Sequence, residues 1–162
     1  MSTIPRHEPE SMPILRPAAW CVLALSAASC AEPISPWAEV LTHAVATSAC
    51  GPTDGPAIAI YLSHAPVQPP PPSAPYLRMN IWHPLEGLAV RSWSLVGSQV
   101  DGAAVYHSTA SEHEFATRGK VSITRVESDS TIHGIADVTF PGAGRIRRHF
   151  EAVWFTQAQL CG

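Results

Sequence analysis

Several short segments after residue 50 place their large apolar residues at every second position, and this period of two predicts β-strands. In the segment 57–63, for example, Ile58, Ile60 and Leu62 share one face. Turn-forming Gly, Pro and Asp residues separate the alternating segments, and no long apolar stretch of helical period appears among them. The predicted strands are Ala57–Ser63, Tyr76–His83, Arg91–Val96, Ala103–Ser108, Lys120–Glu127, Thr131–Phe140 and Arg145–Phe155.

These strands predict a single all-β domain, packed as an antiparallel β-sandwich. A small β-barrel is the alternative, but the variable strand lengths and one long loop favour the sandwich. That loop is the segment 67–75, whose four successive prolines lack backbone N–H groups and therefore cannot form a central strand. The segment 37–49 fits a short N-terminal helix, from the spacing of Trp37, Leu41 and Val45, and fits a strand equally well.

The last two strands predict a hairpin with a defined register. Their apolar faces match across the hairpin when Phe140 lies opposite Ile146, which requires a five-residue loop over 141–145. The same register predicts three further pairs, which are Ile132 with Trp154, Ala136 with Phe150, and Asp137 with His149.

The start of the chain has the pattern of an export signal. Arg16 precedes a short apolar run over 18–28, which ends in small residues before Cys30. The run is shorter than the roughly 20 apolar residues that a membrane-spanning helix needs. The predicted organisation is a signal peptide over 1–29, a tether over 30–36 and a single β domain over 37–162.

The four cysteines support this processing. Cys21 leaves with the signal, and Cys30 is either modified as the first residue of the mature chain or removed as well. Cys50 and Cys161 remain, and two cysteines left in an oxidising compartment usually form a disulfide. The alternative is two unrelated buried thiols.

Charge argues against a nucleic-acid partner. The 162-residue chain is 46% apolar and has a formal charge of −3. One local basic cluster is present, formed by Arg145, Arg147 and Arg148, and its plainest interpretation is the charged end of a hairpin.

Signatures of metal binding or catalysis are absent from the sequence. The motifs HExxH, CxxC and GxSxG do not occur, and neither does a glycine-rich phosphate loop. The nearest approach to a metal site is Glu112-His113-Glu114 with His107 upstream, where an extended chain directs both carboxylates to one face. We expect these residues to be solvated, and we expect no catalytic residue, metal or cofactor.

Aromatic residues supply the candidates for ligand binding. Tyr61 and Trp82 fall on the faces opposite the apolar stripes of their strands, and Trp93 lies beyond the turn that follows Trp82. An aromatic outer face is suited to a glycan or another protein. The alternative is that these rings cover the edge of the core.

The residues Ala27-Ala28-Ser29-Cys30 resemble the lipobox of bacterial lipoproteins, in which the cysteine is acylated. Together with Gly134, Asp137, the segment 150–154 and Cys161, they make the chain similar to uncharacterised small β-rich bacterial lipoproteins. This resemblance implies a β domain anchored through a lipid on Cys30 and implies no activity. Ala31 after the cysteine implies the outer membrane or cell surface; a periplasmic or secreted soluble protein is the alternative.

We therefore expect a non-enzymatic exported protein of the cell envelope that acts in interaction or assembly. Its expected partners are the membrane, through the anchor, and envelope proteins or glycan. One alternative is a β module that binds a small ligand or glycan. Another is a hydrolase in which Asp137 and His149 act with Ser122 or Ser130.

Overall fold

The computed structural model describes residues 33–52, 55–67, 70–82, 88–96, 101–128, 130–156 and 161. The chain divides into two units, residues 1–30 and 31–162, and every described element belongs to the second. The seven predicted strands are all present, and the all-β prediction is confirmed. The elements are α1 (Trp37–Val40), β1 (His43–Cys50), β2 (Pro56–Ser63), β3 (Tyr76–Trp82), β4 (Ser92–Ser94), β5 (Gly102–His107), β6 (His113–Phe115), β7 (Arg118–Val126), β8 (Ile132–Phe140) and β9 (Gly144–Phe155).

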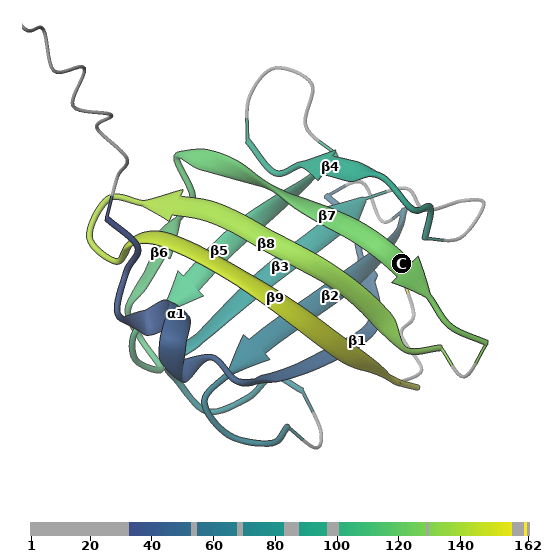
Figure 1. Cartoon of the computed structure of the whole chain (residues 1–162), viewed down its shortest axis with the longest axis horizontal. Coiled ribbons are helices and arrows are strands. Elements are labelled where there is room, and N and C mark those ends of the chain that lie inside the picture. The colour runs from purple at the N-terminus through teal and green to yellow at the C-terminus, as the bar shows by residue number, and fades with distance from the viewer. Residues whose placement is uncertain are drawn as a thin grey trace, which may run out of the picture. The chain divides into compact units, whose positions relative to one another are not determined.

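The strands form one nine-stranded sheet in the order β4-β7-β8-β9-β1-β2-β3-β5-β6. The sheet curls over itself, so that β7, β8 and β9 face β5, β3 and β2 (Figure 1). It thus has the two facing layers of a sandwich within one continuous sheet. The prediction of purely antiparallel strands is wrong at one place, because β1 and β9 pair in parallel. The paired residues are Val45 with Val153, Ala46 with Trp154 and Thr47 with Phe155.

The core lies between the two layers. Every second residue of β8, from Ile132 to Phe140, is buried, as is every second residue of β3. The rings of Tyr106 on β5 and Phe140 on β8 meet across the core, with centroids 5.9 Å apart. The inward faces predicted for the last two strands are therefore confirmed.

The predicted register of the β8–β9 hairpin is wrong by two residues. Phe140 pairs with Gly144, and the turn between them spans only residues 141–143. A shift of two residues leaves every side chain on its own face, so alternation cannot distinguish the two registers. The conformation of the turn sets the register instead, because Gly144 has a φ of +74°, which glycine adopts without strain. Three predicted pairs change as a result: Ile132 lies opposite Ala152, Ala136 opposite Arg148, and Asp137 opposite Arg147.

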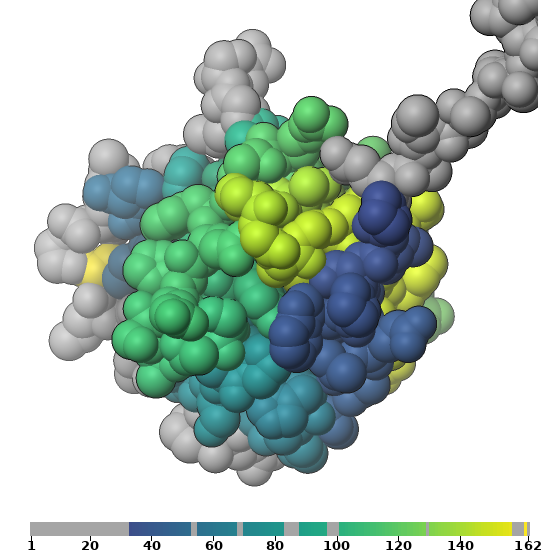
Figure 2. Space-filling model, turned by 90° about the vertical axis from the view of Figure 1, so that its left-hand side faces the viewer, coloured from purple at the N-terminus to yellow at the C-terminus, as the bar shows by residue number. Residues whose placement is uncertain are grey.

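The segment 37–49 contains both of the alternatives that its pattern left open. The helix α1 comes first and the strand β1 follows. Ala38 and Leu41 are buried in the core, and the ring of Trp37 lies 6.1 Å from that of Tyr106. Figure 2 shows this end of the domain, where the dark blue N-terminal residues lie against the yellow-green residues late in the chain. The helix thus covers one end of the space between the layers.

A second, smaller apolar cluster lies on the outer side of β1 and β2. Tyr61 is its largest member and is only 6% exposed. The buried members are Val45, Ala49, Ala57, Ala59 and Tyr61, and Val67, Tyr76, Trp82 and Phe155 pack against them. The proline-rich segment 67–75 lies between β2 and β3, as predicted, although residues 68 and 69 are outside the described part of the chain.

The predicted pairing of Cys50 with Cys161 is confirmed, since their sulfur atoms are at the distance of a disulfide bond. The pair links the end of β1 to a residue beyond β9. The predicted signal peptide over 1–29 and the lipidation site Cys30 lie outside the described residues. Within the described part, no helix has the length and hydropathy to cross a bilayer.

Candidate functional site

The outer face of β7, β8 and β9 carries a concentration of charged side chains. Six of the ten Lys and Arg residues of the chain belong to β7 and β9, although the chain as a whole has a charge of −3. Alternation directs five of them outward, while Arg148 falls on the inward side and is partly buried. The five outward cations are Arg118, Lys120, Arg125, Arg145 and Arg147.

Four of these cations surround one carboxylate near the β8–β9 turn, and we call this group the basic patch. Asp137 lies between Lys120 on β7 and Arg147 on β9, and the next row contains Arg118 and Arg145 on either side of Thr139. Nε and Nη2 of Arg145 donate to the two carboxylate oxygens of Asp137, each at 2.8 Å.

Asp137 is held ionised within this patch. The hydrogen bonds from Arg145 lower the pKa of Asp137, and the charges of Arg145, Arg147 and Lys120 act in the same direction. Burial opposes this shift without reversing it. Four cations and one carboxylate leave the basic patch with three net positive charges.

A shallow hollow of about 620 Å³ is lined on one side by four members of the basic patch, Arg118, Lys120, Asp137 and Arg145. Ser92 and Ser94 line its other side, together with Asp101, whose carboxylate accepts a hydrogen bond from the Ser94 amide. The Ser92 hydroxyl is hydrogen-bonded to that of Ser122 at 2.8 Å. The Ser94 hydroxyl donates to the backbone oxygen of Val96 at 2.9 Å, so the cations are what this hollow offers to anionic groups such as phosphate or carboxylate.

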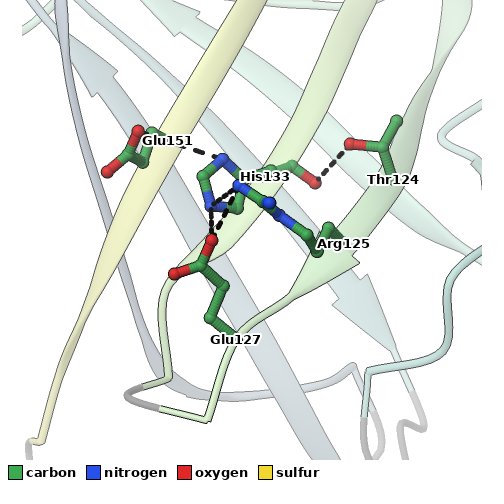
Figure 3. Close-up of polar contacts among 5 residues, drawn as sticks. All are labelled: Thr124, Arg125, Glu127, His133 and Glu151. Carbon is green, nitrogen blue, oxygen red and sulfur yellow. Dashed lines mark hydrogen bonds and ion pairs between the residues drawn. The ribbon is translucent and has the colours of Figure 1, made fainter.

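A second polar cluster lies at the other end of the same face (Figure 3). The Glu127 carboxylate lies 2.7 Å from Nη2 of Arg125 and 2.9 Å from Nε2 of His133. The Thr124 hydroxyl donates to the backbone oxygen of His133, and Glu151 on β9 approaches the ring at 3.9 Å. Among the described residues, no group of three or more His, Cys, Asp or Glu side chains is placed to hold a metal ion. With histidine neutral, one arginine and two carboxylates give this cluster a net charge of −1, in contrast to the basic patch.

The three predicted aromatic candidates do not form one site. Trp93 is 4% exposed and belongs to the main core, where Arg91 lies over its ring at 3.7 Å. Tyr61 and Trp82 both belong to the second apolar cluster on the outer side of β2 and β3. The sheet therefore separates Trp93 from the other two, and all three rings pack against protein.

The residues of the predicted catalytic alternative also have other partners. His149 lies opposite Ile135, and Asp137 binds Arg145 rather than His149. The Ser122 hydroxyl bonds to Ser92, as described above.

The two carboxylates of the Glu112-His113-Glu114 segment bind separate groups. Glu114 accepts hydrogen bonds from the amides of Gly142 and Ala143, whereas Glu112 lies near the Ser108 hydroxyl. His113 lies against the ring of His107 instead, at 5.5 Å between centroids.

Reasoning from the sequence missed that Arg118 and Lys120 join the arginines of β9. The signal was present, because both residues have the parity of the polar face of their strand. Their place beside Asp137, however, depends on the register between β7 and β8.

Comparisons of the chain with protein-family models, with curated proteins and with solved structures found no match.

Proposed function

We propose that this protein is an exported, lipid-anchored, non-enzymatic domain of the cell envelope that acts in interaction or assembly. The observation that carries the proposal is the exposed, charged outer face of β7, β8 and β9 on a domain whose interior is filled by its own side chains. A face that exposes charges in this density is suited to recognition of another surface.

The anchor is supported by the sequence before the domain. Arg16, the short apolar run and the small residues before Cys30 form an export signal with a cysteine at its end. Acyl chains on that cysteine give durable attachment to a bilayer.

The alternative functions receive less support. A small ligand held between the layers would enter at an open end, and α1 covers one end with the buried side chains of Ala38 and Leu41. A hydrolase built on Asp137 and His149 would need these residues in contact, and Asp137 is held by Arg145. We therefore favour interaction through the outer face.

Cell fractionation with matched cysteine variants tests this proposal. In a bacterial host, the wild-type protein and Cys21→Ser should stay in the membrane pellet after a wash with concentrated salt, because Cys21 leaves with the signal. Cys30→Ser should be removed by the same wash. Mass spectrometry of the wild-type protein should give an acylated chain beginning at Cys30. A Cys30→Ser protein that resists the salt wash, or an unmodified Cys30 in the wild type, would refute the anchor.

A further inference from the structure

The chain enters the folded domain beside the basic patch. Ile34 forms a parallel bridge with Arg145, and the Ser35 amide donates to the backbone oxygen of Arg145 at 2.6 Å. In Figure 1 the start of the described chain lies next to the turn that joins β8 to β9. The N-terminal segment is therefore fixed to the same strand that supplies Arg145 and Arg147 to the patch.

The distance from this point to the anchor is short. Cys30 precedes Ile34 by four residues, and four extended residues span at most about 14 Å. An acylated Cys30 would therefore hold Ile34 within about 14 Å of the bilayer surface, and Arg145 lies one strand spacing, about 5 Å, from Ile34. Electrostatic attraction acts over roughly 8–10 Å at physiological ionic strength. The basic patch is thus the part of the outer face that a short tether brings within reach of lipid headgroups.

Charge on the rest of the domain favours the same orientation. The basic patch has three net positive charges, while the whole chain has a charge of −3, so the remainder of the molecule is acidic. Glu114 lies at the turn, but its carboxylate accepts hydrogen bonds from two backbone amides there. An anionic surface would attract the patch end and repel the rest.

We infer that the basic patch, Arg118, Lys120, Arg145 and Arg147 around Asp137, binds the anionic phospholipid headgroups of the bilayer that carries the anchor. Headgroup phosphates would meet these cations in the hollow that Ser92, Ser94 and Asp101 also line; the Ser94 hydroxyl there already donates to the backbone oxygen of Val96. The cluster of His133, Glu127 and Arg125 lies at the other end of the same face, farther from the anchor. This inference rests on the proposed function, because the anchor is what places the patch at the membrane.

A weak, defined anchor makes the contribution of the patch measurable. We would produce the mature chain 30–162, which contains every described element and the disulfide, and couple a single 14-carbon maleimide chain to the free Cys30 thiol. One such chain gives reversible binding with a constant of about 10⁴ M⁻¹. Binding is then compared between vesicles of phosphatidylcholine alone and vesicles that contain one quarter phosphatidylglycerol.

The patch variant Lys120→Gln/Arg147→Gln removes two exposed cations, and Arg78→Gln/Arg125→Gln removes two cations from elsewhere. The wild type should prefer the anionic vesicles, and the patch variant should bind them about 30-fold more weakly, which corresponds to about 1 kcal/mol for each charge. The control should stay within about twofold of the wild type. Equal losses in both variants, or no preference for anionic vesicles, would overturn the inference.

This outcome is independent of the fractionation experiment, because the acyl chain is attached chemically. If the cell does not acylate Cys30, fractionation fails and the vesicle preference still reports on the patch. If the patch does not bind lipid, the vesicle preference is lost and the Cys30→Ser result is unchanged.

Discussion

The two outer faces of the sheet differ sharply, although the same alternation of residues produces both. On the outer side of β1 and β2 most side chains are small and apolar, with the ring of Tyr61 and the hydroxyl of Thr47 as exceptions, and they are buried by neighbouring segments. On the outer side of β7, β8 and β9 the side chains are charged, and Lys120 and Arg147 are exposed. The first face adds to the stability of the domain, while the second is left available for binding. Substitutions on the first face should therefore cost more unfolding free energy than substitutions on the second.

The largest effect on stability should come from removing the disulfide between Cys50 and Cys161. Replacing both Cys50 and Cys161 by Ser frees a loop with a sequence separation of 111 residues, which should lower the free energy of unfolding by on the order of 4–5 kcal/mol. Urea unfolding measures this change. Wild-type protein unfolded with a reductant should show a comparable loss, and a loss of less than about 1 kcal/mol in both cases would contradict a stabilising role for the bridge.

A matched pair of alanine substitutions then separates the two faces directly. Tyr61→Ala removes a buried ring that contacts Tyr76 and lies under Arg78, and should cost about 3 kcal/mol in unfolding free energy. His149→Ala removes an exposed ring from the charged face and should change the unfolding free energy by less than about 0.5 kcal/mol. Both are measured by urea unfolding. Similar costs for the two variants would show that the faces do not differ in this way.

A smaller effect, and one that depends on pH, is expected within the basic patch. Asp137→Asn removes the carboxylate that binds Arg145 and should lower the free energy of unfolding by about 1 kcal/mol at pH 7. The pKa of Asp137 in the folded protein lies below the ordinary value of 3.8. Its ionised form therefore stabilises the fold above that value, and this contribution is lost as the pH falls through the lower, folded pKa.

Unfolding at pH 7 and again below pH 3.8 tests that dependence. The difference between wild type and Asp137→Asn should shrink at the lower pH. An equal difference at both pH values would show that the carboxylate charge is not what stabilises the hairpin. The same variant should also bind anionic vesicles more tightly than the wild type, because it removes the negative charge from the patch.

Much of the fold could be predicted because alternation reports directly on which face of a strand is buried. Ile132, Val138 and Phe140 were assigned to the inward face from their spacing alone. The cysteine pairing followed from counting the residues that remain after processing. The three-residue strand β6 was missed because it is too short to show any alternation.

The register and the candidate site could not be obtained in the same way. A hairpin shifted by two residues buries the same faces, so only the conformation of Gly144 distinguishes the alternatives. That shift decides whether Asp137 faces His149 or Arg147, and therefore whether the face resembles a catalytic pair or a basic patch. The prediction that the aromatic candidates share one outer face is wrong because the two rings lie on opposite sides of the sheet. Trp93 lies on the inward side of its strand, and Tyr61 lies on the outward side of its own.

The bridge between Ile34 and Arg145 also has a mechanical consequence. The segment runs parallel to β9, and β9 lies inside the sheet between β8 and β1. A pull directed along the axis of β9 would load the Ile34–Arg145 bridge and the hydrogen bond of the Ser35 amide in shear. A tether attached to an edge strand would instead be peeled away one bond after another. Under the proposed anchoring at Cys30, force on the chain would therefore reach the domain through a strand inside the sheet and not through an edge strand.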